Sequence, residues 1–101
     1  MIRVLLVDDH EIVRRGLADL FEADGDIEVT GQAGSVAEAK RVIDSADPHV
    51  AVLDVRLPDG TGMDLCAALS VSHPEVACMM LTSFADDRAV VEAAEAGAAA
   101  Y

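Results

Sequence analysis

The stretch VLLVDDH at residues 4–10 is an apolar run that ends in two adjacent carboxylates. An unbroken aliphatic run of this kind is typical of a strand that is covered on both faces, as in a parallel sheet. Two like charges at the end of such a strand indicate either an acidic turn exposed to water or one half of a cation site. The other strand ends of the chain decide between these two interpretations.

Three further strand-like runs follow, and segments with helical periodicity separate them. The four predicted strands span residues 2–7, 27–32, 50–53 and 76–81. Strands that alternate with helices predict an α/β fold, in which a parallel sheet carries helices on both faces. We therefore expect one doubly wound domain over residues 1–101, and residues 98–101 read as the start of a fifth strand.

The segments after these strands show the apolar spacing of amphipathic helices. Ser35 and Glu38 form a capping box that starts the second helix, and the fourth, over residues 87–96, has an alanine-rich face that buries little. The residues expected to face the sheet in the first three helices are Val13, Leu17, Leu20 and Phe21, then Val36, Ala39 and Ile43, and then Leu65 and Leu69.

Composition narrows the range of functions. Nineteen acidic residues against seven basic ones give a net charge of −12, which opposes binding of this segment to a nucleic-acid backbone. No apolar run approaches the ~18 residues of a membrane span, and the N-terminus lacks a signal-peptide pattern, so we predict a cytoplasmic protein. Cys66 and Cys78 have no metal-ligand spacing, and we expect them, like Met79 and Met80, to pack in the core.

The strand ends gather acidic and hydroxyl side chains. Asp8 and Asp9 end the first strand, Asp54 ends the third, and Thr82 and Ser83 follow the fourth. In an open parallel sheet, ligands bind outside the carboxyl ends of the strands. Three carboxylates brought together there repel one another unless a cation neutralises them, and oxygen ligands with free water positions suit Mg²⁺.

An acidic turn remains the plain alternative for Asp8 and Asp9, because turns and helix starts favour aspartate. Asp54 favours the cation site, since it is a lone acid after an apolar strand and precedes a turn with Pro58 and Gly60. His10 adjoins the acids, but imidazole suits transition metals better than Mg²⁺, so we expect it to start the first helix instead.

Four segments together are similar to the receiver domain of two-component response regulators: VLLVDDH (4–10), AVLDVRLPDGTG (51–62), MMLTSF (79–84) and AGAAAY (96–101). The segments VDDHEIVRRGL and LDVRLPDGTG are similar to those of the NarL/LuxR-type subfamily, whose receivers precede a helix-turn-helix domain. The resemblance implies a flavodoxin-like sheet with strand order 2-1-3-4. It also implies a chain that is C-terminally incomplete relative to five strand-helix units, because the family's lysine beyond the final aromatic is absent.

The resemblance implies a role for each acidic residue. Asp54 is the residue expected to accept a phosphoryl group, which a sensor histidine kinase would supply. Asp8, Asp9, Asp54 and the backbone carbonyl of Arg56 are the expected Mg²⁺ ligands. The chain would therefore take part in its own phosphorylation without being an enzyme that acts on other substrates.

The resemblance also implies a switch and an output. Thr82 and Ser83 would contact the phosphoryl group, and Tyr101 would change position with Thr82. The partners expected are the kinase, a second copy in a homodimer, and DNA through an output domain for transcription regulation that lies outside this segment.

Two other functions stay open at this point. One is a non-phosphorylated interaction or dimerisation module with the same fold, which the missing lysine allows. The other is a Mg²⁺-dependent phosphatase that forms an aspartyl-phosphate intermediate, although Asp8 and Asp9 are adjacent and lack the Asp-x-Asp spacing of that class.

Overall fold

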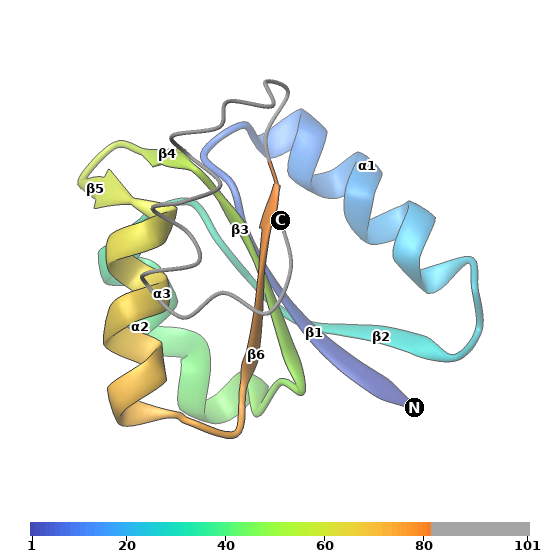
Figure 1. Ribbon diagram of the computed structural model, residues 1–101. Helices are drawn as coiled ribbons and strands as arrows, with labels where there is room; N and C mark the ends of the chain where they lie inside the picture. The colour runs from blue at the N-terminus through green and yellow to red at the C-terminus, as the bar shows by residue number, and fades with distance from the viewer. Residues whose placement is uncertain (82–101) are drawn as a thin grey trace.

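The computed structural model of the chain describes residues 1–81 (Figure 1). The predicted helix at 87–96 and the predicted strand start at 98–101 lie outside the described residues. Within residues 1–81, none of the helices combines the length and the apolar content that crossing a lipid bilayer requires.

A parallel sheet of four strands forms the centre of the described part, in the order β2-β1-β3-β6. Its strands are β1 (Ile2–Val7), β2 (Ile27–Ala33), β3 (Val50–Asp54) and β6 (Ala77–Leu81). The predicted order 2-1-3-4 is confirmed, because β6 is the fourth strand of this sheet along the chain. The turn predicted after Asp54 is a small antiparallel hairpin of β4 (Arg56–Leu57) and β5 (Gly60–Thr61).

Helices cover both faces of the sheet, as the doubly wound, flavodoxin-like architecture requires (Figure 1). On one face, α1 (Glu11–Glu22) packs Leu17, Ala18 and Phe21 against Val4, Leu6 and Val52. On the other face lie α2 (Val36–Ala46) and α3 (Gly62–Ser72), over the larger core. The fully buried side chains of that core include Leu5, Val7, Leu53, Leu65 and Cys66.

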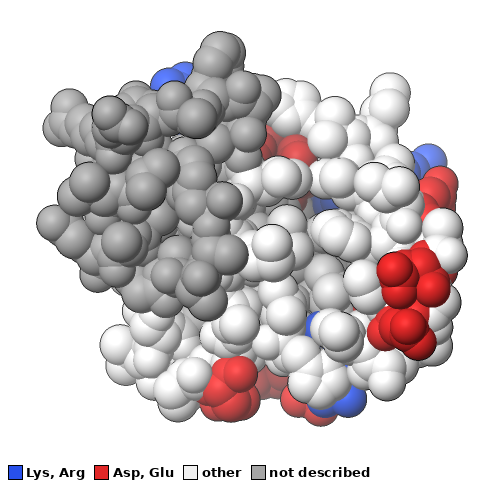
Figure 2. All heavy atoms as spheres, turned by 45° about the vertical axis from the view of Figure 1, so that its right-hand side comes forward, with Lys and Arg blue, Asp and Glu red and all other residues white. Residues whose placement is uncertain are grey.

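Two predictions about buried side chains are wrong. Val13 and Leu20 are 51% and 69% exposed. The reason is that α1 faces the sheet through a stripe centred between Phe21 and Ala18, and Val13 and Leu20 lie about a third of a turn away from it. Met79 is 42% exposed because β6 buries only alternate residues, among them Cys78 and Met80. On the side of the molecule that carries α1, Figure 2 shows a broad area without charged side chains.

The first turn of α2 confirms the Ser35 half of the predicted capping box, while Glu38 reaches one residue further back than the box requires. Ser35 Oγ accepts a hydrogen bond from the backbone N–H of Glu38 at 3.1 Å, and Glu38 Oε1 accepts one from the backbone N–H of Gly34 at 3.2 Å. The first bond satisfies a donor that the helix start leaves without an intrahelical partner, and the second ties Glu38 to the residue before the cap.

Replacing Ser35 by alanine is expected to lower the free energy of unfolding by about 1 kcal/mol, the usual cost of losing an N-cap acceptor. Urea unfolding followed by circular dichroism measures the change. Ser45→Ala is the matched control, since Ser45 lies in the same helix and its hydroxyl only donates to the carbonyl of Val42. An equal loss in both variants would contradict the cap.

Candidate functional site

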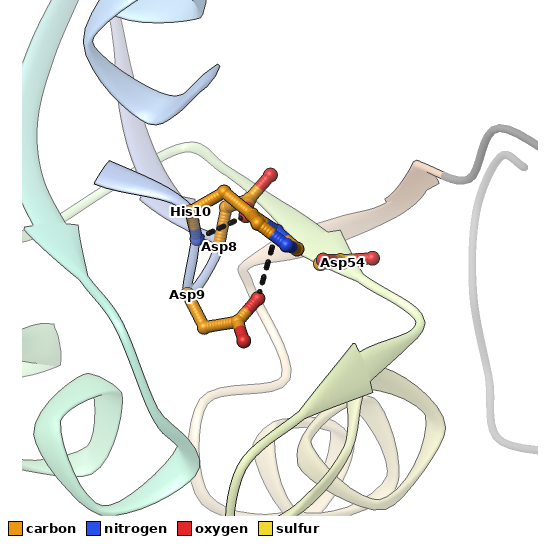
Figure 3. Close-up of side chains that lie close together, drawn as sticks. All are labelled: Asp8, Asp9, His10 and Asp54. Carbon is orange, nitrogen blue, oxygen red and sulfur yellow. Dashed lines mark hydrogen bonds and ion pairs between the residues drawn. The ribbon is translucent and has the colours of Figure 1, made fainter. Parts of the chain in front are cut away.

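Strand register brings the predicted acidic residues together. Val7 of β1 pairs with Leu53 of β3, so Asp8 and Asp54 leave neighbouring strands at the same level of the sheet. One ligand atom from each of Asp8, Asp9, His10 and Asp54 lies within 4.8 Å of the others. Figure 3 shows these four side chains gathered where β1 and β3 end.

Asp8 is the most enclosed of the group, at 7% exposed, and the chain holds it from several sides. Its backbone N–H donates to the carbonyl of Ala33 at the end of β2, at 3.0 Å. Its own carbonyl accepts from Arg14 Nη1 at 2.8 Å, so α1 is tied to the end of β1. Its carboxylate Oδ1 accepts a hydrogen bond from the backbone N–H of His10 at 2.8 Å.

Asp54 sits half-buried at the end of β3, and its environment disfavours the charged form. Burial raises the pKa of Asp54 above its ordinary value, and the negative charge of Asp8 raises it further. The backbone N–H of Arg56, 3.5 Å from Asp54 Oδ1, lowers the pKa, and the charge of Asp9 adds a smaller increase. The three carboxylates thus carry mutual repulsion that a cation would relieve.

His10 forms the N-cap position of α1, as predicted, and its ring also joins the acidic cluster. His10 Nδ1 lies 3.2 Å from Asp8 Oδ1 and 3.0 Å from Asp9 Oδ1 (Figure 3). Its side chain is largely exposed to solvent. Among residues 1–81, no lysine or arginine side chain forms an ion pair with Asp8, Asp9 or Asp54.

The donor set fits a hard divalent cation. Three carboxylates from two strand ends supply oxygen ligands, and burial, followed by the negative charges of Asp8 and Asp9, raises the pKa of Asp54. A small ion with a preference for oxygen, such as Mg²⁺, takes one or two such carboxylates and keeps several waters. The cluster is therefore a candidate Mg²⁺ site.

A family model described as the response regulator receiver domain matches residues 4–101, nearly the whole chain. The chain belongs to the response regulator receiver domain family. This finding confirms the family that the four sequence segments indicated.

Relatives of this receiver domain include transcriptional regulators. Over 101 residues, the whole of this chain, it is 54% identical to the DNA-binding transcriptional activator DevR/DosR of Mycobacterium tuberculosis, of which it covers 46%. It is 42% identical to the transcriptional regulatory protein LiaR of Bacillus subtilis over 103 residues, covering 48% of that protein. The receiver domain thus spans about half the length of these relatives.

Solved structures share the fold. A two-component response regulator of the LuxR family from an Aurantimonas species aligns with a TM-score of 0.94 at 30% identity, over 100% of this chain and 72% of that one. The signal receiver domain of the response regulator NarL from Mycobacterium tuberculosis aligns with a TM-score of 0.91 at 29% identity, over 98% of this chain and 80% of that one. The receiver domain therefore resembles members of the subfamily that the sequence indicated.

The described part of the receiver domain brings together Asp8, Asp9 and Asp54, and it places the Arg56 backbone beside Asp54. Thr82, Ser83 and Tyr101 lie outside the described residues, so their roles stay predictions.

Two residues near the site carry contacts that sequence reasoning missed. Arg14 bridges Gln32 Oε1 and the carbonyl of Asp8, at 3.1 and 2.8 Å. Asp59, at the tip of the β4–β5 hairpin, accepts two backbone N–H groups of α2. The sequence signal for Asp59 was an aspartate in a Pro-Asp-Gly turn, which indicates turn chemistry and gives no hint of a helix 22 residues upstream.

Proposed function

We propose that this chain is the phosphorylation-dependent receiver of a two-component response regulator, with Asp54 as the phosphoryl acceptor. The observation that carries the proposal is the convergence of Asp8, Asp9 and Asp54 at one end of a receiver-family sheet. Asp54 is half-buried yet reachable, and no lysine or arginine among residues 1–81 neutralises it.

In the transfer, a carboxylate oxygen of Asp54 attacks the phosphorus of a phosphohistidine on a sensor kinase. The new O–P bond forms as the N–P bond breaks, and the electron pair of that bond stays on the imidazole nitrogen, which then takes up a proton. Mg²⁺, held by Asp8, Asp9, Asp54 and the Arg56 carbonyl, would supply charge neutralisation for the transferring group.

The remaining residues position the acceptor. The β1–β3 register keeps Asp54 level with Asp8, and Arg14 holds the backbone of Asp8 against α1. We assign Thr82 and Ser83 to contacts with the phosphoryl oxygens and Tyr101 to the change that follows. We assign the output to transcription regulation through a DNA-binding domain, which the names of the relatives DevR/DosR and LiaR support. We further propose that the protein acts as a homodimer in the cytoplasm.

Incubation with Mg²⁺ and acetyl phosphate tests the proposal. We expect intact-mass spectrometry to detect one added phosphoryl group on the parent chain and none on Asp54→Asn, which keeps the shape and removes the nucleophile. Chelation of Mg²⁺ is expected to abolish the addition to the parent. Asp19→Asn removes one negative charge elsewhere and is expected to leave a single added group. Incorporation into Asp54→Asn, or none into the parent, would contradict Asp54 as acceptor.

A further inference from the structure

The start of α2 is capped from two separate parts of the chain. Ser35 Oγ accepts the backbone N–H of Glu38, as described above. The backbone N–H groups of Val36 and Ala37 remain, and both donate to the carboxylate of Asp59, at 2.7 Å to Oδ1 and 3.0 Å to Oδ2. A carboxylate that accepts two N–H groups at a helix N-terminus makes charge-assisted bonds, in the place where the helix dipole favours negative charge.

Asp59 belongs to the segment that follows the acceptor. Only Val55 separates Asp54 from β4, and the register of the hairpin pairs Arg56 with Thr61 and Leu57 with Gly60. Asp59 is the last residue of the turn between these two short strands (Figure 1). The bidentate contact therefore ties the tip of the hairpin to α2.

The same hairpin sets the surroundings of the Asp54 carboxylate. The Arg56 N–H points to Asp54 Oδ1, and the N–H of Gly62, just after the hairpin, donates to the carbonyl of Val55 at 2.9 Å. Leu57, the residue just before the turn, is 8% exposed and anchors the hairpin in the core. At the tip, Gly60 lies against α2 so closely that a Cβ there would come within 3.3 Å of Val36 Cγ2.

We propose that Asp59 is a positioning residue for phosphoryl transfer to Asp54, because its double bond to the N-terminus of α2 holds the β4–β5 hairpin, and with it the Arg56 backbone, beside the acceptor. This inference rests on the proposed function of Asp54. Asp59 is not a member of the acidic cluster of Asp8, Asp9, His10 and Asp54. Its contribution is to limit the positions that the loop after Asp54 can take.

A comparison of two cap variants tests the inference. Asp59→Ala and Ser35→Ala each remove an acceptor from the first turn of α2, but only Asp59→Ala also releases the hairpin. Asp59→Asn keeps one acceptor oxygen at the same distance from the backbone and serves as the conservative rescue. The readouts are the initial rate of phosphorylation of Asp54 by acetyl phosphate with Mg²⁺, the Mg²⁺ affinity by calorimetry, and the urea midpoint.

We expect Asp59→Ala to lower the rate or the Mg²⁺ affinity by about 10-fold, less than the ~100-fold that a 1 Å misplacement caused by a distant mutation can cost. Ser35→Ala is expected to change the urea midpoint without changing either readout, and Asp59→Asn to recover most of the parent rate. Equal rates together with equal Mg²⁺ affinities for Asp59→Ala and Ser35→Ala would overturn the inference while the function of Asp54 stands. A parent chain that takes up no phosphoryl group would instead overturn the proposed function, and the inference with it.

Discussion

Replacing Gly62 by alanine is expected to lower the free energy of unfolding by about 2–3 kcal/mol, within the range of overpacked cores. Gly62 is the first residue of α3, it is buried, and it lies against the backbone of Asp54, the last residue of β3. A Cβ there would overlap the backbone oxygen of Asp54, and it would lie 3.0 Å from that carbonyl carbon and 2.7 Å from Met80 Cε. The methionine tip can move aside, but the backbone of β3 is held by strands on both sides.

Gly16→Ala is the matched control for this prediction. Gly16 lies within α1, and a Cβ there would meet nothing within 4 Å. The same chemical change should stabilise the chain by about 0.5–1 kcal/mol, because alanine loses less backbone entropy in a helix. Guanidinium unfolding of the two variants at unchanged slope measures both effects. Opposite signs are expected, and a Gly62→Ala variant as stable as the parent would show that β3 yields to the added methyl group.

The Gly62 contact illustrates what sequence patterns reveal and what they do not. Apolar runs located the four strands of the main sheet to within one residue at each end, because strands that helices cover on both faces are aliphatic almost throughout. The proximity of Asp8, Asp9 and Asp54 could be predicted from the same pattern, since the carboxyl ends of parallel strands share one edge of the sheet. The strand order itself came from the family resemblance.

Features that depend on the packing angle of an element were not predictable in this way. Val13 and Leu20 have the right spacing for a buried stripe, but the angle at which α1 meets the sheet selects Leu17, Ala18 and Phe21. The hydrogen bonds of Asp59 to α2 likewise depend on how the β4–β5 hairpin packs against that helix, and no local sequence pattern encodes this contact. Hydrophobic periodicity identifies a face approximately, while tertiary packing decides which residues within it are covered.

Mg²⁺ is expected to stabilise the parent chain, by about 2.7 kcal/mol at a hundredfold excess over its dissociation constant, because it binds a site that exists only in the folded state. Asp8→Asn and Asp54→Asn should lose most of this response. Asp8→Asn keeps the Oδ1 acceptor for the His10 N–H, so its loss of response would report the missing charge and not a broken turn. Thermal unfolding with and without Mg²⁺ measures the response of each variant.

Without a divalent cation, Asp54→Asn is expected to be more stable than the parent at neutral pH. Burial and the charge of Asp8 raise the pKa of Asp54 in the folded chain, so folding favours its protonated form. The contribution of Asp54 to stability is therefore fully present below its unfolded pKa, and it is lost as the pH rises through the folded value. Above that window the ionised carboxylate opposes folding, and the asparagine removes this cost.

Asp19→Asn separates this effect from a general change in net charge. Asp19 is exposed on α1, and its replacement by asparagine removes the same single charge from a chain of net charge −12. We expect Asp19→Asn to change the midpoint of unfolding less than Asp54→Asn does in EDTA, and to keep the full Mg²⁺ response. The interpretation would be contradicted by an Asp54→Asn variant that is no more stable than the parent in EDTA, or that Mg²⁺ stabilises as much as the parent. Either result would show that the cation does not act by relieving the repulsion among the carboxylates. Since Mg²⁺ and the asparagine remove the same repulsion, their stabilising effects should not add.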